Sequence, residues 1–288
     1  MHGRPRRRAL PRRKGHPLIG LRPAPRSLVT AAFAAAAFGL ISCAEPAAQV
    51  VAKPATSVET EIEIGSDQNL QAYTREELLR QFNPATHPGF SRIPDAWTDK
   101  DGIYLRTEVL EACGRMRDAA TADGVTLVVR SATRNFDYQK GIWERKWQRN
   151  RYMGWQSVDK ARDILTYSAM PGASRHHWGS DIDFNSFENE WFESGEGAEV
   201  YAWLCTHAEE YGFHQVYDDK STGRTGYELE RWHWSYMPTA GPMLAAYNAL
   251  VSGGDLTGAP FSGAETADSL AVLRDFVNGL ALPQTSER

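Results

Sequence analysis

Two short segments alternate polar and apolar side chains, and this alternation limits the folds open to the chain more than any other feature. In Asp181–Phe184 the two carboxylates share one face of an extended strand and the two apolar side chains share the other. In Arg231–Tyr236, His233 and Ser235 share one face, and three aromatic side chains share the opposite face. We therefore expect two strands that pack an apolar face into the core and turn a polar face toward a cleft.

Helical periodicity and β-branched runs outline the rest of the fold. Apolar residues recur at helical spacing from Ile103 to Ala122 and from Glu199 to Tyr211, where Gly212 ends the second helix. Further predicted elements are a helix beginning near Thr74, a strand at Val125–Val129, a helix at about Tyr138–Arg149, a strand at Phe213–Tyr217 and two helical pieces after Pro238. Because strands and helices do not alternate regularly, the pattern predicts an α+β fold with a small, mostly antiparallel sheet flanked by helices.

The N-terminal region has the composition of an export signal. Nine basic residues and no acidic one precede Cys43, although the chain as a whole carries a net charge of -4. A nearly apolar run of about 14 residues, Leu28 to Ile41, follows the basic stretch, and it is shorter than the ~20 residues of a membrane-spanning helix. Ser42 then precedes Cys43, which resembles a bacterial lipoprotein signal. We expect Cys43 to be lipidated; an ordinary signal peptide and an uncleaved anchor are the alternatives.

This pattern divides the chain into four parts. We expect a lipoprotein-type signal peptide at residues 1–43, a flexible tether at 44–73, a folded domain at 74–238 and a C-terminal helical extension at 239–288. The protein would then be exported and lipid-anchored to the membrane facing the periplasm or cell wall, in the outer membrane if the host has one. The body of the chain is acidic, which argues against nucleic acid as a partner. We expect a monomer, in which Cys113 and Cys205 either form a disulfide or remain thiols.

Four residues carry the chemistry that the spacing suggests. A catalytic zinc ion takes three protein ligands, accepts imidazole nitrogen or carboxylate oxygen, and keeps a fourth position for water, whose pKa it lowers to about 7. His176, Asp183 and His233 would form such a set in a cleft on the sheet. Glu230, three residues before His233, must lie in a turn before the strand to reach the same side as a general base. On spacing alone, packed histidines and a turn-capping aspartate are favoured over a zinc site, and no HExxH motif is present.

Three segments resemble the motifs of the VanY-like D-alanyl-D-alanine carboxypeptidases, a family of zinc-dependent murein peptidases. Ser174–Asp183 resembles S-x-H-x-x-G-x-x-x-D, Glu230–Tyr236 is similar to E-x-W-H-x-x-Y, and Ser131–Gln139 resembles S-x-x-R-x-x-x-x-Q. The motifs occur in the order of the family, and the resemblance covers about residues 75 to 238.

The resemblance implies a role for each matched residue. His176, Asp183 and His233 would bind Zn²⁺, Glu230 would be the catalytic base, Arg134 would stabilise the oxyanion or hold the substrate, and Gln139 and Ser174 would hold the terminal carboxylate and backbone of the substrate. An arginine fork suits an anion of this kind. One departure is Asp181, where the family commonly has a small residue; it would be either a partner that orients a ligand histidine or a rival ligand. His177 is a lesser rival to His176.

These observations favour a zinc peptidase domain at 74–238 that hydrolyses D-alanine-containing stem peptides of peptidoglycan, with D-alanyl-D-alanine carboxypeptidase as the first hypothesis. An L,D-carboxypeptidase or a murein endopeptidase would use the same residues on a different bond. A zinc-containing wall-binding lipoprotein without turnover is the alternative from another class. Glu230 favours an enzyme, because a binding module has no need for a base beside its metal.

Overall fold

The computed structural model describes residues 73–79 and 81–283. The predicted signal peptide at 1–43, its lipidation site Cys43 and nearly all of the predicted tether at 44–73 lie outside the described residues. In the described part of the chain, the helices lack the length and apolar character of a membrane span.

The described residues form an α+β fold, as predicted. The helices are α1 Arg75–Leu78, α2 Thr107–Ala122, α3 Phe136–Trp147, α4 Ser157–Leu165, α5 Gly195–His207, α6 Met237–Leu250 and α7 Gly253–Thr257, followed by a π-helical segment at Val272–Val277. The strands are β1 Phe90–Arg92, β2 Tyr104–Arg106, β3 Val129–Ser131, β4 Asp181–Phe184, β5 Phe213–His214 and β6 His233–Tyr236.

The main sheet is small and antiparallel throughout, in the order β3-β4-β6-β5. Within it, Asp183 lies directly opposite His233, and Asp181 lies directly opposite Ser235. Because side chains alternate across a strand, this register brings all four side chains to one face. The pairing confirms the two faces that the alternating sequence patterns predict.

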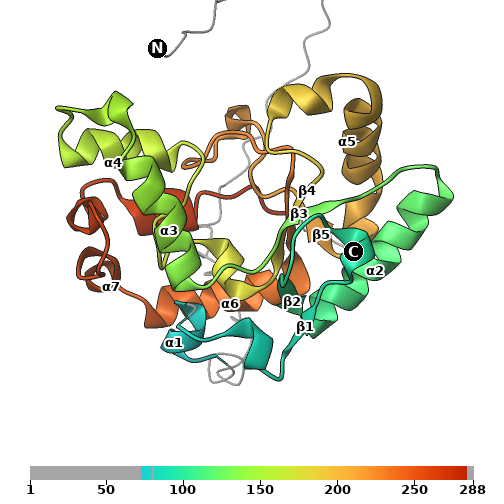
Figure 1. Ribbon diagram of the computed structural model, residues 1–288, viewed down its shortest axis with the longest axis horizontal. Helices are drawn as coiled ribbons and strands as arrows, with labels where there is room; N and C mark the ends of the chain where they lie inside the picture. The colour runs from blue at the N-terminus through green and yellow to red at the C-terminus, as the bar shows by residue number, and fades with distance from the viewer. Residues whose placement is uncertain (1–72, 80, 284–288) are drawn as a thin grey trace, which may run out of the picture. The chain divides into compact units, whose positions relative to one another are not determined.

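The two faces of the sheet meet different layers. Ile182 and Phe184 of β4 and Trp234 of β6 join a buried apolar cluster with α2 and α5. In Figure 1 these two helices lie on one side of the strands, and α3 and α4 lie on the other. A second apolar cluster joins α3, α4 and α6 to the C-terminal segment. The polar face of β4 and β6 is thereby directed toward the space between the two clusters.

Several predicted boundaries differ from the structure. The helix expected from Ile103 begins at Thr107, because residues 104–106 form β2 and pair with β1, a hairpin that the sequence patterns did not indicate. The strand expected at Val125–Val129 begins only at Val129; the backbone N–H of Val128 instead donates to the side chain of Asn185. The strand expected at Phe213–Tyr217 ends after two residues.

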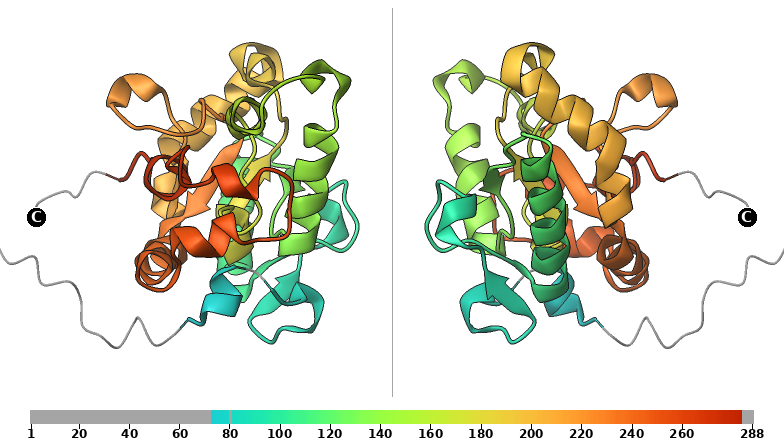
Figure 2. Two further views of the ribbon diagram at one scale, coloured as in Figure 1. Left: turned by 90° about the vertical axis from the view of Figure 1, so that its left-hand side faces the viewer. Right: turned by 90° about the vertical axis from the view of Figure 1, so that its right-hand side faces the viewer.

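The C-terminal extension packs against α3 and against the loop that carries Tyr227. Trp143 of α3 donates through Nε1 to the carbonyl of Ser262 at 2.7 Å, and Tyr227 meets Phe276 edge-on at 5.1 Å. Figure 2 shows this segment, orange to red, beside α3. Cys113 is buried in α2 and Cys205 is exposed on α5; both are free thiols.

Candidate metal centre

A short 3-10 turn at Arg175–Trp178 precedes β4 and presents His176. Gly179 ends this turn in the left-handed region, with φ of 77°. A Cβ atom there would lie 2.3 Å from Cε1 of Phe90. Only glycine therefore fits both the backbone conformation and the close approach of Phe90, and the turn it permits sets His176 beside Asp183 on the next strand.

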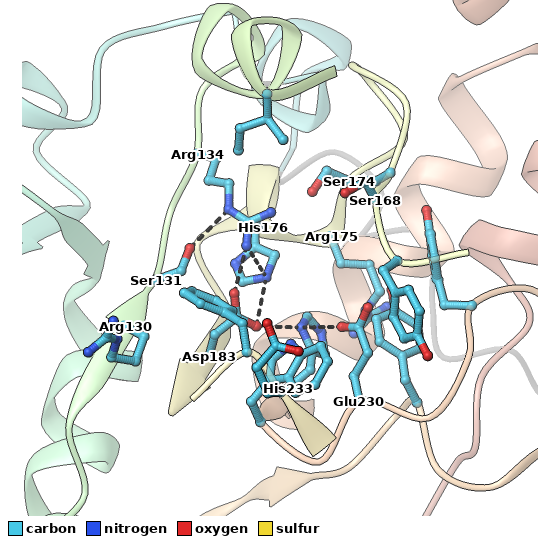
Figure 3. Close-up of a pocket in the computed structure, with 18 of the residues that line it drawn as sticks. Arg130, Ser131, Arg134, Ser168, Ser174, Arg175, His176, Asp183, Glu230 and His233 are labelled. Atoms are coloured by element: carbon cyan, nitrogen blue, oxygen red, sulfur yellow. Dashed lines mark hydrogen bonds and ion pairs between the residues drawn. The ribbon is translucent and has the colours of Figure 1, made fainter. Parts of the chain in front are cut away.

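His176, Asp183 and His233 meet on the polar face of the sheet, and all three are buried. One potential ligand atom from each lies within 4.8 Å of the other two. Nδ1 of His176 is 2.8 Å from the carbonyl of Ala132, which can only accept, so Nδ1 carries the proton and Nε2 keeps its lone pair. Figure 3 shows these side chains converging.

His233 is oriented by a buried carboxylate. Its Nε2 lies 2.9 Å from Oδ2 of Asp181, and its Nδ1 lies 3.0 Å from Oδ1 of Asp183. Asp181 is fully buried and also accepts from Nε of Arg175 at 3.0 Å and from the hydroxyl of Ser235 at 2.8 Å. These partners occupy both oxygens of Asp181, so the geometry supports the orienting role for Asp181 and not the role of a rival ligand.

Electrostatics fix the charge states around this histidine. Burial opposes charge on Asp181, but the Arg175 guanidinium and His233 outweigh it and hold the pKa of Asp181 well below its usual range. Burial also disfavours a charged His233, yet its hydrogen bonds to Asp181 and Asp183 raise its pKa to about 9. The two carboxylates therefore favour a positive charge at the position of His233.

Glu230 lies in the predicted turn before β6. The N–H of His233 donates to the carbonyl of Glu230 at 3.2 Å and closes the turn, and Oε2 of Glu230 stands 3.8 Å from Nδ1 of His233. The side chain is buried. Burial, with a smaller contribution from Asp183, raises the pKa of Glu230 to about 7. We call His176, Asp183 and His233 together the metal group. A carboxyl group with a pKa of about 7 beside these residues can both take and return a proton near neutral pH.

Arg134 forms hydrogen bonds both to the metal group and to residues behind it. Its Nη2 lies 2.6 Å from Oδ2 of Asp183 and 3.2 Å from Nε2 of His176, while its Nε donates to the hydroxyl of Ser131 at 2.9 Å. Its guanidinium therefore places a positive charge directly beside His176 and Asp183.

The structure also places the other residues that the sequence singled out: Ser174, Gln139 and His177. Ser174 lines the cavity, as expected for a residue that contacts substrate. Gln139 is fully buried behind Arg134: Oε1 accepts from Arg134 Nη1 at 3.2 Å, and Nε2 donates to the carbonyl of Ala169 at 2.8 Å. Both groups of its amide are thus engaged, and the geometry supports a role in positioning Arg134. His177 bridges the N–H of Gly172 and the carbonyl of Arg134, away from the metal group.

The site opens into a cavity of about 560 Å³ that also contains residues the sequence motifs did not single out. Arg175, Lys146, Ser168, Tyr217 and Tyr227 line it together with the predicted site residues. Arg175 shares the 3-10 turn of His176, whereas the other four lie outside the three motif segments, so no local signal identifies those four. Ser235 carried a weak signal, since it shares a strand face with His233.

Comparison with known proteins finds similarity to carboxypeptidases over about half of the chain. Residues 102–239 match the VanY family, described as D-alanyl-D-alanine carboxypeptidase. The chain is 34% identical over 120 residues to a D-alanyl-D-alanine carboxypeptidase of Enterococcus faecalis, covering 42% of this chain and 43% of that protein. It is 32% identical over 137 residues to YodJ of Bacillus subtilis, provisionally named a carboxypeptidase, covering 46% of each.

Among solved structures, VanYB in complex with D-alanine-D-alanine is 26% identical; the match covers 58% of this chain and 87% of that one, with a TM-score of 0.43. The chain spans less than half the length of the curated relatives that it matches.

Proposed function

We propose that this protein is a zinc peptidase of the VanY-like family that removes D-alanine from the end of peptidoglycan stem peptides. The match of residues 102–239 to the family described as D-alanyl-D-alanine carboxypeptidase supports this proposal. The observation that carries the proposal is the placement of a buried Glu230 and of Arg134 against the His176, Asp183 and His233 group. A binding module would need the metal ligands alone. The base and the anion-stabilising arginine are needed only for turnover.

The donor set fits zinc. Two imidazole nitrogens and a carboxylate oxygen are the usual ligands of a catalytic site, and they leave a fourth position open. Each histidine is held through its other nitrogen by an acceptor, His176 by a carbonyl and His233 by Asp181, which fixes the nitrogen directed at the metal group. When bound, zinc supplies Lewis acidity that acidifies water and polarises a carbonyl oxygen.

The chain's own residues supply the proton transfers and charge stabilisation. Glu230 takes a proton from the attacking water and returns it to the leaving amine of the terminal residue. Arg134 donates to the oxygen of the scissile carbonyl as negative charge builds on it, an effect typically worth about 2.7–4 kcal/mol of barrier. Gln139 and Ser131 hold the guanidinium in that position.

The proposed substrate lies outside the cytoplasm, so the proposal includes export and lipid anchoring at Cys43. That part rests on the N-terminal sequence alone. It would place the catalytic domain on the outer side of the membrane, within reach of the wall.

The proposal is tested by mass spectrometry of stem peptides incubated with the zinc-loaded protein, beside the matched variant Glu230→Gln. We expect the wild type, and not the variant, to remove one D-alanine from a pentapeptide ending in D-Ala-D-Ala. Shortening of a tetrapeptide only would identify an L,D-carboxypeptidase, and cleavage of cross-linked dimers only would identify an endopeptidase. Zinc binding with no change in any of these peptides would overturn the peptidase function in favour of a wall-binding protein.

A further inference from the structure

The cations that line the cavity differ in how they are paired. Four of them have a carboxylate within ion-pair distance: Lys100 and Arg130 with Asp99, Arg134 with Asp183, and Arg175 with Asp181. Lys146 differs from these four. Among the described residues, no carboxylate lies within 4.0 Å of its ammonium group, which donates to the hydroxyl of Ser168. The side chain is half-buried, and a half-buried ammonium with only a neutral partner leaves room for an anion.

Lys146 and Glu230 line the same cavity, and no ion pair joins these two described residues. In Figure 3, Ser168, the hydroxyl partner of Lys146, lies with Ser174 on the Glu230 side of the metal group, whereas Arg130 and Ser131 lie on the opposite side. On this side of the cavity, the ammonium group of Lys146 is therefore a positive charge without an ion-pair partner among the described residues.

The cavity wall also holds an unsatisfied donor. The hydroxyl of Tyr227 is buried and has no hydrogen-bond partner among the described residues, and Tyr227 lines the same cavity. A buried donor without a partner costs free energy. Tyr227 is backed by Phe276 of the C-terminal extension at 5.1 Å, so this part of the cavity wall depends on that extension as well as on the sheet.

We propose that Lys146 is the residue that binds the free terminal carboxylate of the substrate, with the hydroxyls of Ser168 and Ser174 beside it. The inference rests on the proposed carboxypeptidase function and names the feature of the substrate that the site selects. Glu230 returns its proton to the leaving amine, so the leaving residue lies next to Glu230. Its carboxylate carbon is only two bonds from that amine, and we place the carboxylate toward Lys146 within the cavity that both side chains line. Burial lowers the pKa of Lys146, which is consistent with a site that is completed by an anion.

This assignment separates two kinds of peptidase. A carboxylate that must meet Lys146 restricts the enzyme to the last peptide bond of a chain. An internal peptide bond would bring a neutral amide to the ammonium group, which replaces a charge-assisted hydrogen bond by a weaker one. The enzyme is then an exopeptidase because of Lys146, and Gln139 acts through Arg134 without contacting the carboxylate.

The test compares two tripeptides that end in D-Ala-D-Ala, one with a free carboxylate and one with a terminal amide. Both are assayed with the zinc-loaded full chain, with Lys146→Met, which keeps the length but not the charge, and with Lys140→Met. Lys140 lies on the same helix outside the cavity and is the matched control. We expect the wild type and Lys140→Met to prefer the acid, and Lys146→Met to lose about 10- to 100-fold in kcat/KM for the acid, mainly through KM, with little change for the amide.

A binding measurement keeps the proposal independent of turnover. Calorimetry with the zinc-loaded Glu230→Ala variant should give a Kd for the acid about 10- to 100-fold lower than for the amide, and adding Lys146→Met should abolish the difference. Equal binding of acid and amide, or an unchanged preference in Lys146→Met, overturns the role of Lys146 while leaving the carboxypeptidase function intact. Absence of cleavage together with acid-selective binding would instead remove the proposed function and retain the anion site.

Discussion

Replacing Asp181 by asparagine tests the buried network that orients His233. Asp181 is fully buried; one oxygen accepts from Arg175 and His233, and the other accepts from the hydroxyls of Ser180 and Ser235. Asparagine keeps the shape of the side chain. Its oxygen can face Arg175 and His233, and its amide group can donate to the serine hydroxyls. The substitution therefore removes charge with little change in packing.

The structure sets the size of the expected effect. Arg175 is 2% exposed, and Asp181 is the carboxylate that pairs with it. Removing one member of a buried pair leaves the other charge uncompensated, which typically costs about 3–5 kcal/mol. We expect the free energy of unfolding to fall by about 3 kcal/mol, at the low end of that range, because the amide oxygen still accepts. Loss of the carboxylate behind His233 should also weaken zinc binding about 10- to 100-fold.

Two assays separate these effects. Urea unfolding of the metal-free protein measures the cost to the fold, and competition with a chromophoric chelator measures the Kd for zinc. A double variant, Arg175→Met with Asp181→Asn, removes both charges; it should recover part of the stability but not the zinc affinity. If Asp181→Asn binds zinc as tightly as the wild type, the carboxylate serves only to pair with Arg175, and the orienting role is refuted.

Three further predictions concern the base, a buried thiol and the turn. Glu230 must be deprotonated to act. Burial raises its pKa to about 7 and a bound Zn²⁺ would lower it, so the acid limb of kcat/KM should lie at or below pH 7. Glu230→Gln should lose about 10²–10⁴ in kcat, and survival of the same limb in that variant would contradict the assignment. Burial raises the pKa of Cys113 to about 12 from 9.0, so its contribution to stability is complete below pH 9 and is lost as pH rises toward 12. Between pH 8 and 10.5 the wild type should lose about 2 kcal/mol more of its unfolding free energy than Cys113→Ala, and equal losses would refute this. Gly179→Ala should cost more than Gly124→Ala in urea unfolding: both glycines have positive φ, but only Gly179 has no room for a Cβ, and equal costs would show that Phe90 yields.

The faces of β4 and β6 could be predicted because strand alternation is a local property of the sequence. Their pairing could not, since Asp183 and His233 are 50 residues apart and the register depends on the whole sheet. The hairpin of β1 and β2 was missed for two reasons. β1 lies between Pro88 and Pro94, which indicate a loop when read locally, and the residues of β2 continue the helical spacing of the segment that follows them.

The candidate metal ligands and the candidate base could be found from motifs, but the residues that support them could not. Arg175 stands at a motif position without an assigned role, yet it is buried against Asp181. Gln139 matched a motif position, and the structure shows its amide committed to Arg134 and Ala169. Such roles depend on partners distant in sequence, whose positions only the folded chain determines.

The central claim is that one zinc ion at His176, Asp183 and His233 enables release of terminal D-alanine. The most direct measurement titrates the chelator-treated protein with zinc and follows D-alanine released from a pentapeptide ending in D-Ala-D-Ala. We predict no release without metal, a linear rise with added zinc and a break at one equivalent, with His233→Ala inactive throughout. Full release from the metal-free protein, or tight binding of one zinc equivalent without any release, would contradict the account.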